Sequence, residues 1–205
     1  MTMDNLPSRA ISKLTITIGI VAVVSIISLT LFFSFGGFWG PLNDLTIAVF
    51  ALLSAALAWM LHPFFRTQSP RLSYFMLITA MVGAVIACIG SALVMSGTTS
   101  WQLAGSVNFL GFAFIGIWLL TFNYHLRLTD AFPQNFTRLG QISGALSALG
   151  LLNVLGIFGM VDSQSDAYWL LNLAQVGGLG EILLLVWIIW LGRVVLKSTK
   201  KNQHG

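Results

Sequence analysis

The sequence predicts an all-α integral membrane protein, a bundle of six helices with both termini in the cytoplasm. Of its 205 residues, 57% are hydrophobic and only 8% are charged, and the mean hydropathy is +0.88. Soluble domains carry roughly 25% charged residues, so a chain this poor in charge cannot cover a surface that faces water. The apolar residues form six runs, each long enough to cross a bilayer as a helix.

These six runs are separated by short polar segments. The first is rich in Ile, Val and Thr, but a lone strand in lipid leaves its backbone polar groups unpaired, so a helix is expected. Arg9 and Lys13 precede it, as in a secretory signal, but the run exceeds the about 7–15 residues of a signal core and is interpreted as an uncleaved span. We expect a turn at Gly36–Asp44, and we expect Pro63 to end the second span. The expected spans, which form one transmembrane domain over residues 1–205, are residues 14–35, 45–61, 72–95, 101–124, 139–160 and 168–192.

The basic residues predict the orientation. With the N-terminus inside, one face receives the N-terminal segment, the second and fourth loops and the C-terminal tail, which together hold all ten Lys and Arg residues. The other three loops hold none, but they contain Asp44, Asp162 and Asp166. Because cytoplasmic loops are enriched in Lys and Arg, both termini are predicted to be cytoplasmic.

Glu181 is the acid within the sixth span. At 1.5 Å per residue it lies about 18 Å from Arg193, near the bilayer midplane. An ionised carboxylate without a partner is very costly there, so we expect Glu181 to be protonated, or to face water or a bound cation. A hydrogen bond to Asn153 or Ser147 of the fifth span is expected, because Asn153 lies at a similar depth and the small residues around Ser147 allow close packing.

Two roles remain open for Glu181. It could be the proton or cation site of a small carrier, since ionisable residues inside a membrane are functional by default. It could equally be a neutral acid that ties two helices together.

Asp44 and Asn108 are further candidates, and each has a structural alternative. Asp44 follows Pro41 where the second span begins, so it either caps this helix or forms a cation site or gate at the outer face. Asn108 either contributes to a substrate or ion site or forms a hydrogen bond between helices. The predicted substrate- or ion-binding residues are therefore Glu181, Asn153, Ser147, Asn108 and Asp44. No catalytic residue or metal ligand is predicted, because no metalloprotease, phosphate-loop or serine-elbow motif is present.

His62 and His125 lie at the cytoplasmic ends of two spans. Paired histidines from facing helices can hold a b-type haem or another metal. Histidine is also tolerated at the level of the lipid headgroups, and membrane cytochromes usually bury their ligands more deeply. No cofactor is therefore predicted.

The last two spans contain the segments RLGQISGALSALGLLNVLG (Arg138–Gly156) and GEILLLVWIIWLGR (Gly180–Arg193). They resemble the closing helices of a bacterial multi-pass membrane family, a domain of unknown function with a glycine-rich span and an end similar to W-x-x-x-LGR. Here the match consists of Trp187 or Trp190 with the Leu191–Arg193 segment. The resemblance implies a six-helix protein of the bacterial inner membrane and transfers no functional residue.

For function, the sequence favours a small transporter or an ion- or proton-coupled carrier centred on Glu181 rather than an enzyme. The alternatives are a non-catalytic accessory or scaffold subunit, and a redox protein that binds a b-type haem or a metal at His62 and His125. The predicted partners are the lipid bilayer and a small molecule or ion. Nucleic acid is not expected, because the net charge of +4 is spread in small groups along the chain. The oligomeric state is left open.

Overall fold

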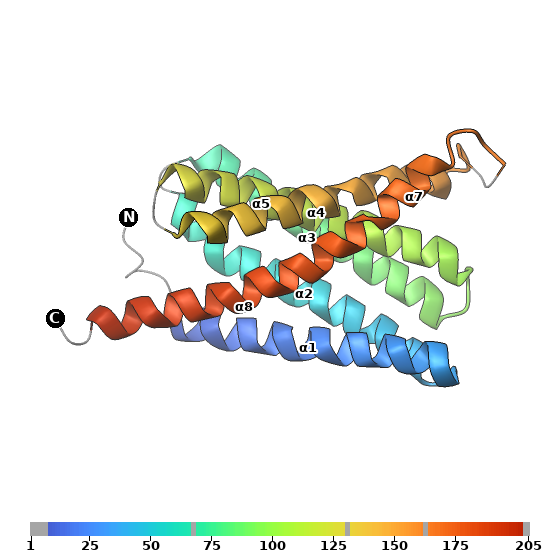
Figure 1. The fold of residues 1–205 in the computed structure, drawn as a ribbon, viewed down its shortest axis with the longest axis horizontal. Helices are drawn as coiled ribbons and strands as arrows, with labels where there is room; N and C mark the ends of the chain where they lie inside the picture. Colours follow the sequence, from blue (N-terminus) through green and yellow to red (C-terminus); the bar gives the residue numbers. More distant parts are fainter. Residues whose placement is uncertain (1–7, 67–68, 130–131, 162–163, 203–205) are drawn as a thin grey trace.

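A computed structural model describes residues 8–66, 69–129, 132–161 and 164–202 of the chain (Figure 1). These residues form helices and turns, and they contain six stretches that are long and apolar enough to cross a membrane. The predicted all-α bundle of six membrane-spanning helices is therefore confirmed. Residues 1–7, with Asp130 and Asp162, lie outside the described part.

Four of the six spans are single helices, and the last two are composite. The first four are α1 (Ser8–Phe35), α2 (Trp39–Arg66), α3 (Pro70–Met95) and α4 (Trp101–Leu128). The fifth span consists of α5 (Gln134–Ala148), the 3-10 helix η2 (Leu149–Leu152) and α6 (Asn153–Ile157). The sixth consists of α7 (Trp169–Gln175) and α8 (Gly177–Asn202).

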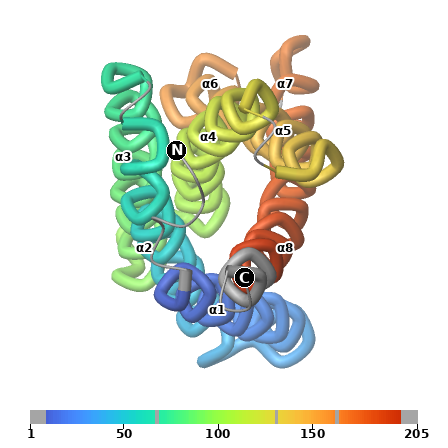
Figure 2. The backbone as a smooth tube through the Cα atoms, turned by 90° about the vertical axis from the view of Figure 1, so that its left-hand side faces the viewer, coloured from blue at the N-terminus to red at the C-terminus, as the bar shows by residue number. Residues whose placement is uncertain are grey.

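The helices form a closed ring. Each of α1 to α4 packs against the next helix in sequence, α5 packs against α8, and α8 returns to α1 (Figure 2). The start of α1, the end of α8, the end of α2 with the start of α3, and the end of α4 with the start of α5 lie at one end of the bundle. We call this the basic end, because it carries the described basic residues Arg9, Lys13, Arg66, Arg71, Arg127, Arg138 and Arg193.

The second span differs from its predicted bounds at both ends. The turn before it is short, with positive φ angles at Gly36 (65°) and Gly37 (64°), and α2 begins at Trp39. Pro41 lies in the first helical turn, where its missing N–H would have no partner in the helix anyway. The expectation that Pro63 ends the helix was wrong, because α2 continues through it to Arg66. Proline is tolerated in a membrane helix where neighbouring helices compensate for the lost hydrogen bond, and the next two residues, Phe64 and Phe65, are buried against the core.

Small residues bring the central helices close together. A Cβ atom on Gly83 of α3 would lie 2.5 Å from the carbonyl oxygen of Gly111 on α4. A Cβ atom on Gly144 of α5 would lie 2.5 Å from the carbonyl oxygen of Gly116 on α4. Membrane helices associate through van der Waals contact of this kind, since lipid gives no hydrophobic drive between them.

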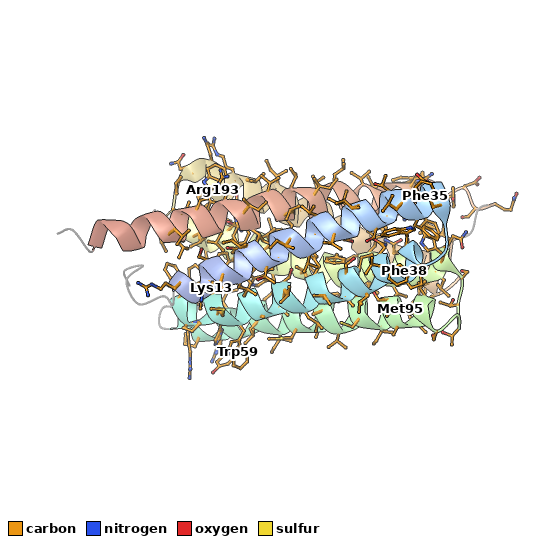
Figure 3. The ribbon with its side chains drawn as sticks, turned by 90° about the horizontal axis from the view of Figure 1, so that it is seen from below. Lys13, Phe35, Phe38, Trp59, Met95 and Arg193 are labelled. Atoms are coloured by element: carbon orange, nitrogen blue, oxygen red, sulfur yellow. The ribbon has the colours of Figure 1, made fainter. Side chains whose placement is uncertain are left out.

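The side chains between the helices are apolar and aromatic towards the basic end. Trp118, Phe122, Phe136 and Trp187 are at most 2% exposed and their rings contact one another. The outward surface between the two ends is also apolar (Figure 3), and its most exposed side chains include Ile16, Ile20, Leu52, Ile78 and Val85. A water-soluble monomer rarely exposes so large an apolar surface, and lipid covers it without cost.

Candidate functional site

The α-helical hydrogen bonding of the fifth and sixth spans is interrupted at the points where they cross. The fifth changes from α-helix to 3-10 helix at η2, and the sixth has one turn residue, Val176, between α7 and α8, whose φ and ψ angles (−60° and −22°) remain helical. A Cβ atom on Gly177 would lie 3.4 Å from the nitrogen of Gly150 and 3.5 Å from the carbonyl oxygens of Leu146 and Ser147. We call the contact between residues 143–153 and 175–181 the polar crossing.

Asn153 joins the two interrupted spans. It is 1% exposed, and its Nδ2 donates a hydrogen bond of 3.0 Å to the carbonyl oxygen of Gly150 within the 3-10 segment. Its Oδ1 accepts a hydrogen bond of 3.4 Å from Nε2 of Gln175 at the end of α7. The buried Asn153 amide thus links the 3-10 segment of the fifth span to the side chain of Gln175 at the end of α7 in the sixth.

Two serines of α5 face Gly180 of α8. Ser143 Oγ donates a hydrogen bond of 2.7 Å to the carbonyl oxygen of Gly180. Ser147 Oγ is buried beside Gly180 and has no hydrogen-bond partner in the described residues. A Cβ atom on Gly180 would lie 2.7 Å from the carbonyl oxygen of Ser143, so only glycine allows this approach.

Glu181 follows Gly180 and is half-buried. It lies on the same face of α8 as Leu184 and Ile188, which are 2% and 0% exposed. The structure contains no hydrogen bond from Glu181 to Asn153 or Ser147, so this expectation is not met. Ser147 instead faces Gly180, one residue and about 100° away around the helix, and Asn153 is engaged by Gly150 and Gln175.

The structure separates Asp44 and Asn108 from the polar crossing. Asp44 is buried on α2, which packs against α1 and α3. It lies beyond the first turn of α2, so the alternative role of a helix cap is wrong. Asn108 is 7% exposed, and its Oδ1, which has no hydrogen-bond partner in the described part of the chain, faces Gly90 of α3. The next residue on α4, Phe109, faces Gly150 and Gly178.

The two histidines have different surroundings. His62 Nδ1 lies 2.7 Å from Ser73 Oγ, and its ring lies 4.9 Å from that of Tyr74. His125 Nδ1 is buried without a partner in the described residues, and its ring lies 6.0 Å from that of Phe65. Among the described residues no group of three or more His, Cys, Asp or Glu side chains could hold a metal ion. That no cofactor binds stays a prediction.

Ser143 and Gln175 belong to the crossing but were outside the predicted set. Ser143 precedes Ser147 by four residues, so the two share a helix face, and this spacing could have found it. No local signal identifies Gln175, because its contact with Asn153 depends on how the two interruptions meet.

The fold and the polar crossing define a multi-pass α-helical membrane protein in which two interrupted spans meet beside an intramembrane acid. No protein-family model, curated protein or solved structure matches this chain. The resemblance of the last two spans to a bacterial family stays a prediction.

Proposed function

We propose that this protein is a small carrier that couples transport of a solute to a proton or a cation at Glu181. The observation that carries the proposal is the polar crossing, in which interruptions of two spans pack against each other next to this acid. Secondary transporters form their substrate and ion sites near the bilayer midplane from discontinuous helices, and the turns at η2 and Val176 are local departures from α-helix in two spans that cross beside Glu181.

The surroundings of Glu181 support a role in binding. The residue is half-buried, and its carboxyl group makes no hydrogen bond or ion pair with any described residue, so nothing in the described bundle neutralises it. A carboxylate in a membrane requires a proton, a cation or water for stability. Ser147 Oγ on α5, which has no hydrogen-bond partner among the described residues, supplies a second polar group at the crossing.

The interruptions also provide positions at which the spans can bend. An α-helix resists bending because each turn is held by hydrogen bonds, whereas element ends absorb changes in φ and ψ at lower cost. The irregular turns at η2 and Val176 lie at the same contact, so movement of α7 and α6 relative to α8 and α5 would alter access to Glu181.

The proposal includes location in a bacterial inner membrane with both termini in the cytoplasm. The described basic residues lie at one end of the bundle, and the described acids outside the middle of the spans, Asp44 and Asp166, lie towards the other. This asymmetry is typical of plasma-membrane proteins whose basic end faces the cytoplasm.

The test is flux in proteoliposomes that contain trapped pH-sensitive and cation-sensitive dyes. A panel of amino acids, sugars, organic acids and inorganic cations is added outside, and solutes that change the internal pH or cation concentration only when the protein is present are selected. Glu181→Gln, which cannot ionise, is expected to fold normally and to lose this coupled signal.

Asp166→Asn is the matched control, because it makes the same acid-to-amide change at an exposed position in the loop before α7. It is expected to retain full flux. Unchanged flux in Glu181→Leu, or no coupled solute for the wild type, would overturn the carrier proposal in favour of an accessory membrane subunit.

A further inference from the structure

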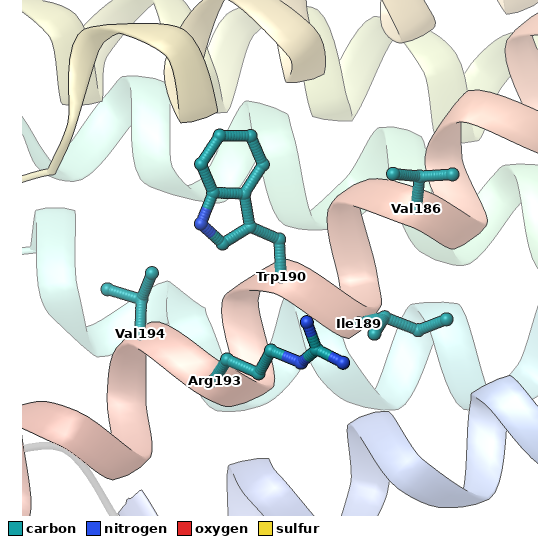
Figure 4. A pocket seen from close by; sticks show the side chains of 5 residues that line it. All are labelled: Val186, Ile189, Trp190, Arg193 and Val194. Atoms are coloured by element: carbon teal, nitrogen blue, oxygen red, sulfur yellow. The ribbon is translucent and has the colours of Figure 1, made fainter.

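A groove runs along the outward face of α8 at the basic end (Figure 4). It has a volume of about 380 Å³ and is lined by Val186, Ile189, Trp190, Arg193 and Val194. The spacing of these residues places them on one face of the helix. The volume lies within the range of about 300–1,000 Å³ found for ligand sites.

The apolar walls of the groove are held in place by neighbouring helices. The Trp190 ring lies 5.7 Å from that of Phe136 on α5, in an edge-to-face arrangement. Ile189 packs against α1, where a Cβ atom on Gly19 would lie 3.7 Å from its Cγ1. The groove is therefore formed before any ligand arrives, and it opens to the lipid between α5 and α1.

Arg193 is the charged residue of the groove. Its side chain is exposed and makes no ion pair or hydrogen bond with any described residue. The described carboxyl groups are Asp44, Asp166 and Glu181, and none of them lies at the basic end. The described protein thus supplies no anion for this guanidinium group, whereas lipid phosphates lie at the membrane surface.

We propose that this groove binds one anionic phospholipid of the leaflet at the basic end. The lipid phosphate binds Arg193, whose planar guanidinium group can donate two parallel hydrogen bonds to phosphate oxygens. One acyl chain lies along Ile189 and Val186, which are closer to the bilayer centre than Arg193. The Trp190 ring provides the wall at the interface, where amphipathic aromatic side chains are favoured.

Charge distinguishes this site from ordinary lipid contact. Any acyl chain can lie against valine and isoleucine, so the apolar part alone gives no preference among phospholipids. A single basic side chain near the surface favours an anionic lipid by about fivefold over a neutral one. The proposal does not depend on whether the protein is a carrier.

Native mass spectrometry of the detergent-purified protein tests the proposal. The protein is incubated with phosphatidylglycerol or with phosphatidylcholine that has the same chains, and retained lipids are counted. The wild type is expected to retain one phosphatidylglycerol in preference to phosphatidylcholine. Arg193→Gln should lower this preference about fivefold, whereas the control Arg138→Gln, at an exposed basic-end position outside the groove, should not.

Two further experiments identify the molecule that occupies the groove. Val186→Trp fills the apolar part of the groove at an exposed position and leaves Arg193 in place, so it should abolish lipid retention without lowering the unfolding temperature. Water-soluble glycerol 3-phosphate should not displace the lipid at equal concentration. Equal losses in Arg193→Gln and Arg138→Gln, retention in Val186→Trp, or displacement by glycerol 3-phosphate would overturn the proposal. A dimer that disappears in Val186→Trp would assign the groove to a second copy of the chain instead.

Discussion

The indole N–H of Trp187 on α8 donates a hydrogen bond of 3.0 Å to Oδ1 of Asn123 on α4, in the interior of the bundle. Both residues are 0% exposed, and Nδ2 of Asn123 donates to the carbonyl oxygen of Leu119 at 2.8 Å. Trp187 also stacks on Phe136 of α5, with ring centroids 5.1 Å apart. These contacts hold α8 in one rotation about its axis, and this rotation determines which way Glu181 faces.

Trp187→Phe is expected to destabilise the protein by about 1–3 kcal/mol, because a buried acceptor on Asn123 loses its donor. SDS-induced unfolding of the purified protein measures the change. Trp59→Phe is the control, since Trp59 is 62% exposed and has no ring contact among the described residues. Similar losses in the two variants would contradict a special role for the Trp187–Asn123 bond.

Gly180→Ala and Gly105→Ala are expected to change stability in opposite directions. A methyl group at Gly180 would meet the carbonyl oxygen of Ser143 at 2.7 Å, so α5 and α8 must separate; overpacking of this kind costs about 1–3 kcal/mol. At Gly105, within α4, a methyl group meets nothing within 4 Å, and alanine should stabilise the helix by about 0.5–1 kcal/mol. The same unfolding assay compares them, and a stable Gly180→Ala variant would argue against the close crossing.

Ser143→Ala and Ser147→Ala form a second pair of opposite sign. Ser143→Ala removes the hydrogen bond to Gly180 and should cost about 0.6 kcal/mol, the average for such bonds in a membrane protein. Ser147→Ala removes a buried hydroxyl that has no partner in the described residues, so it should be neutral or stabilising. Loss of flux in a stable Ser147→Ala variant would show that the Ser147 hydroxyl binds a ligand. A large loss of stability would instead show that this hydroxyl makes a structural hydrogen bond.

Pro63→Ala is expected to stabilise the protein, because α2 is helical on both sides of this residue. Alanine restores a backbone donor within the helix, and proline in a helix interior costs up to about 3 kcal/mol relative to alanine. The unfolding temperature in detergent should rise. A fall would mean that the proline ring makes packing contacts that exceed the gain in helical hydrogen bonding.

Reporter fusions test the orientation. A reporter that is active only in the periplasm should be active when fused at Ser165 and inactive when fused at the C-terminus, because all ten Lys and Arg residues lie in segments assigned to the cytoplasm. A reporter active only in the cytoplasm should give the reverse pattern. Periplasmic activity of the C-terminal fusion would invert the proposed topology.

The sequence by itself determined the class of protein, the number of spans and the prominence of Glu181. These follow from local constraints, since a bilayer requires about 20 apolar residues per helix and a backbone that satisfies its own hydrogen bonds. Glu181 could be singled out because an acid in an apolar span is costly wherever the helix packs.

Only the tertiary structure decided the helix ends and the composition of the polar crossing. Pro63 remains within α2 because packing between neighbouring helices compensates for the hydrogen bond that proline removes. The irregular turns at η2 and Val176 in the last two spans likewise form where these spans pack against each other. Ser147 and Asn153 meet the sixth span, whereas Asn108 turns to Gly90 of α3. Such choices depend on the rotation of each helix about its axis, and that rotation is set by contacts between residues far apart in the chain, such as Trp187 with Asn123.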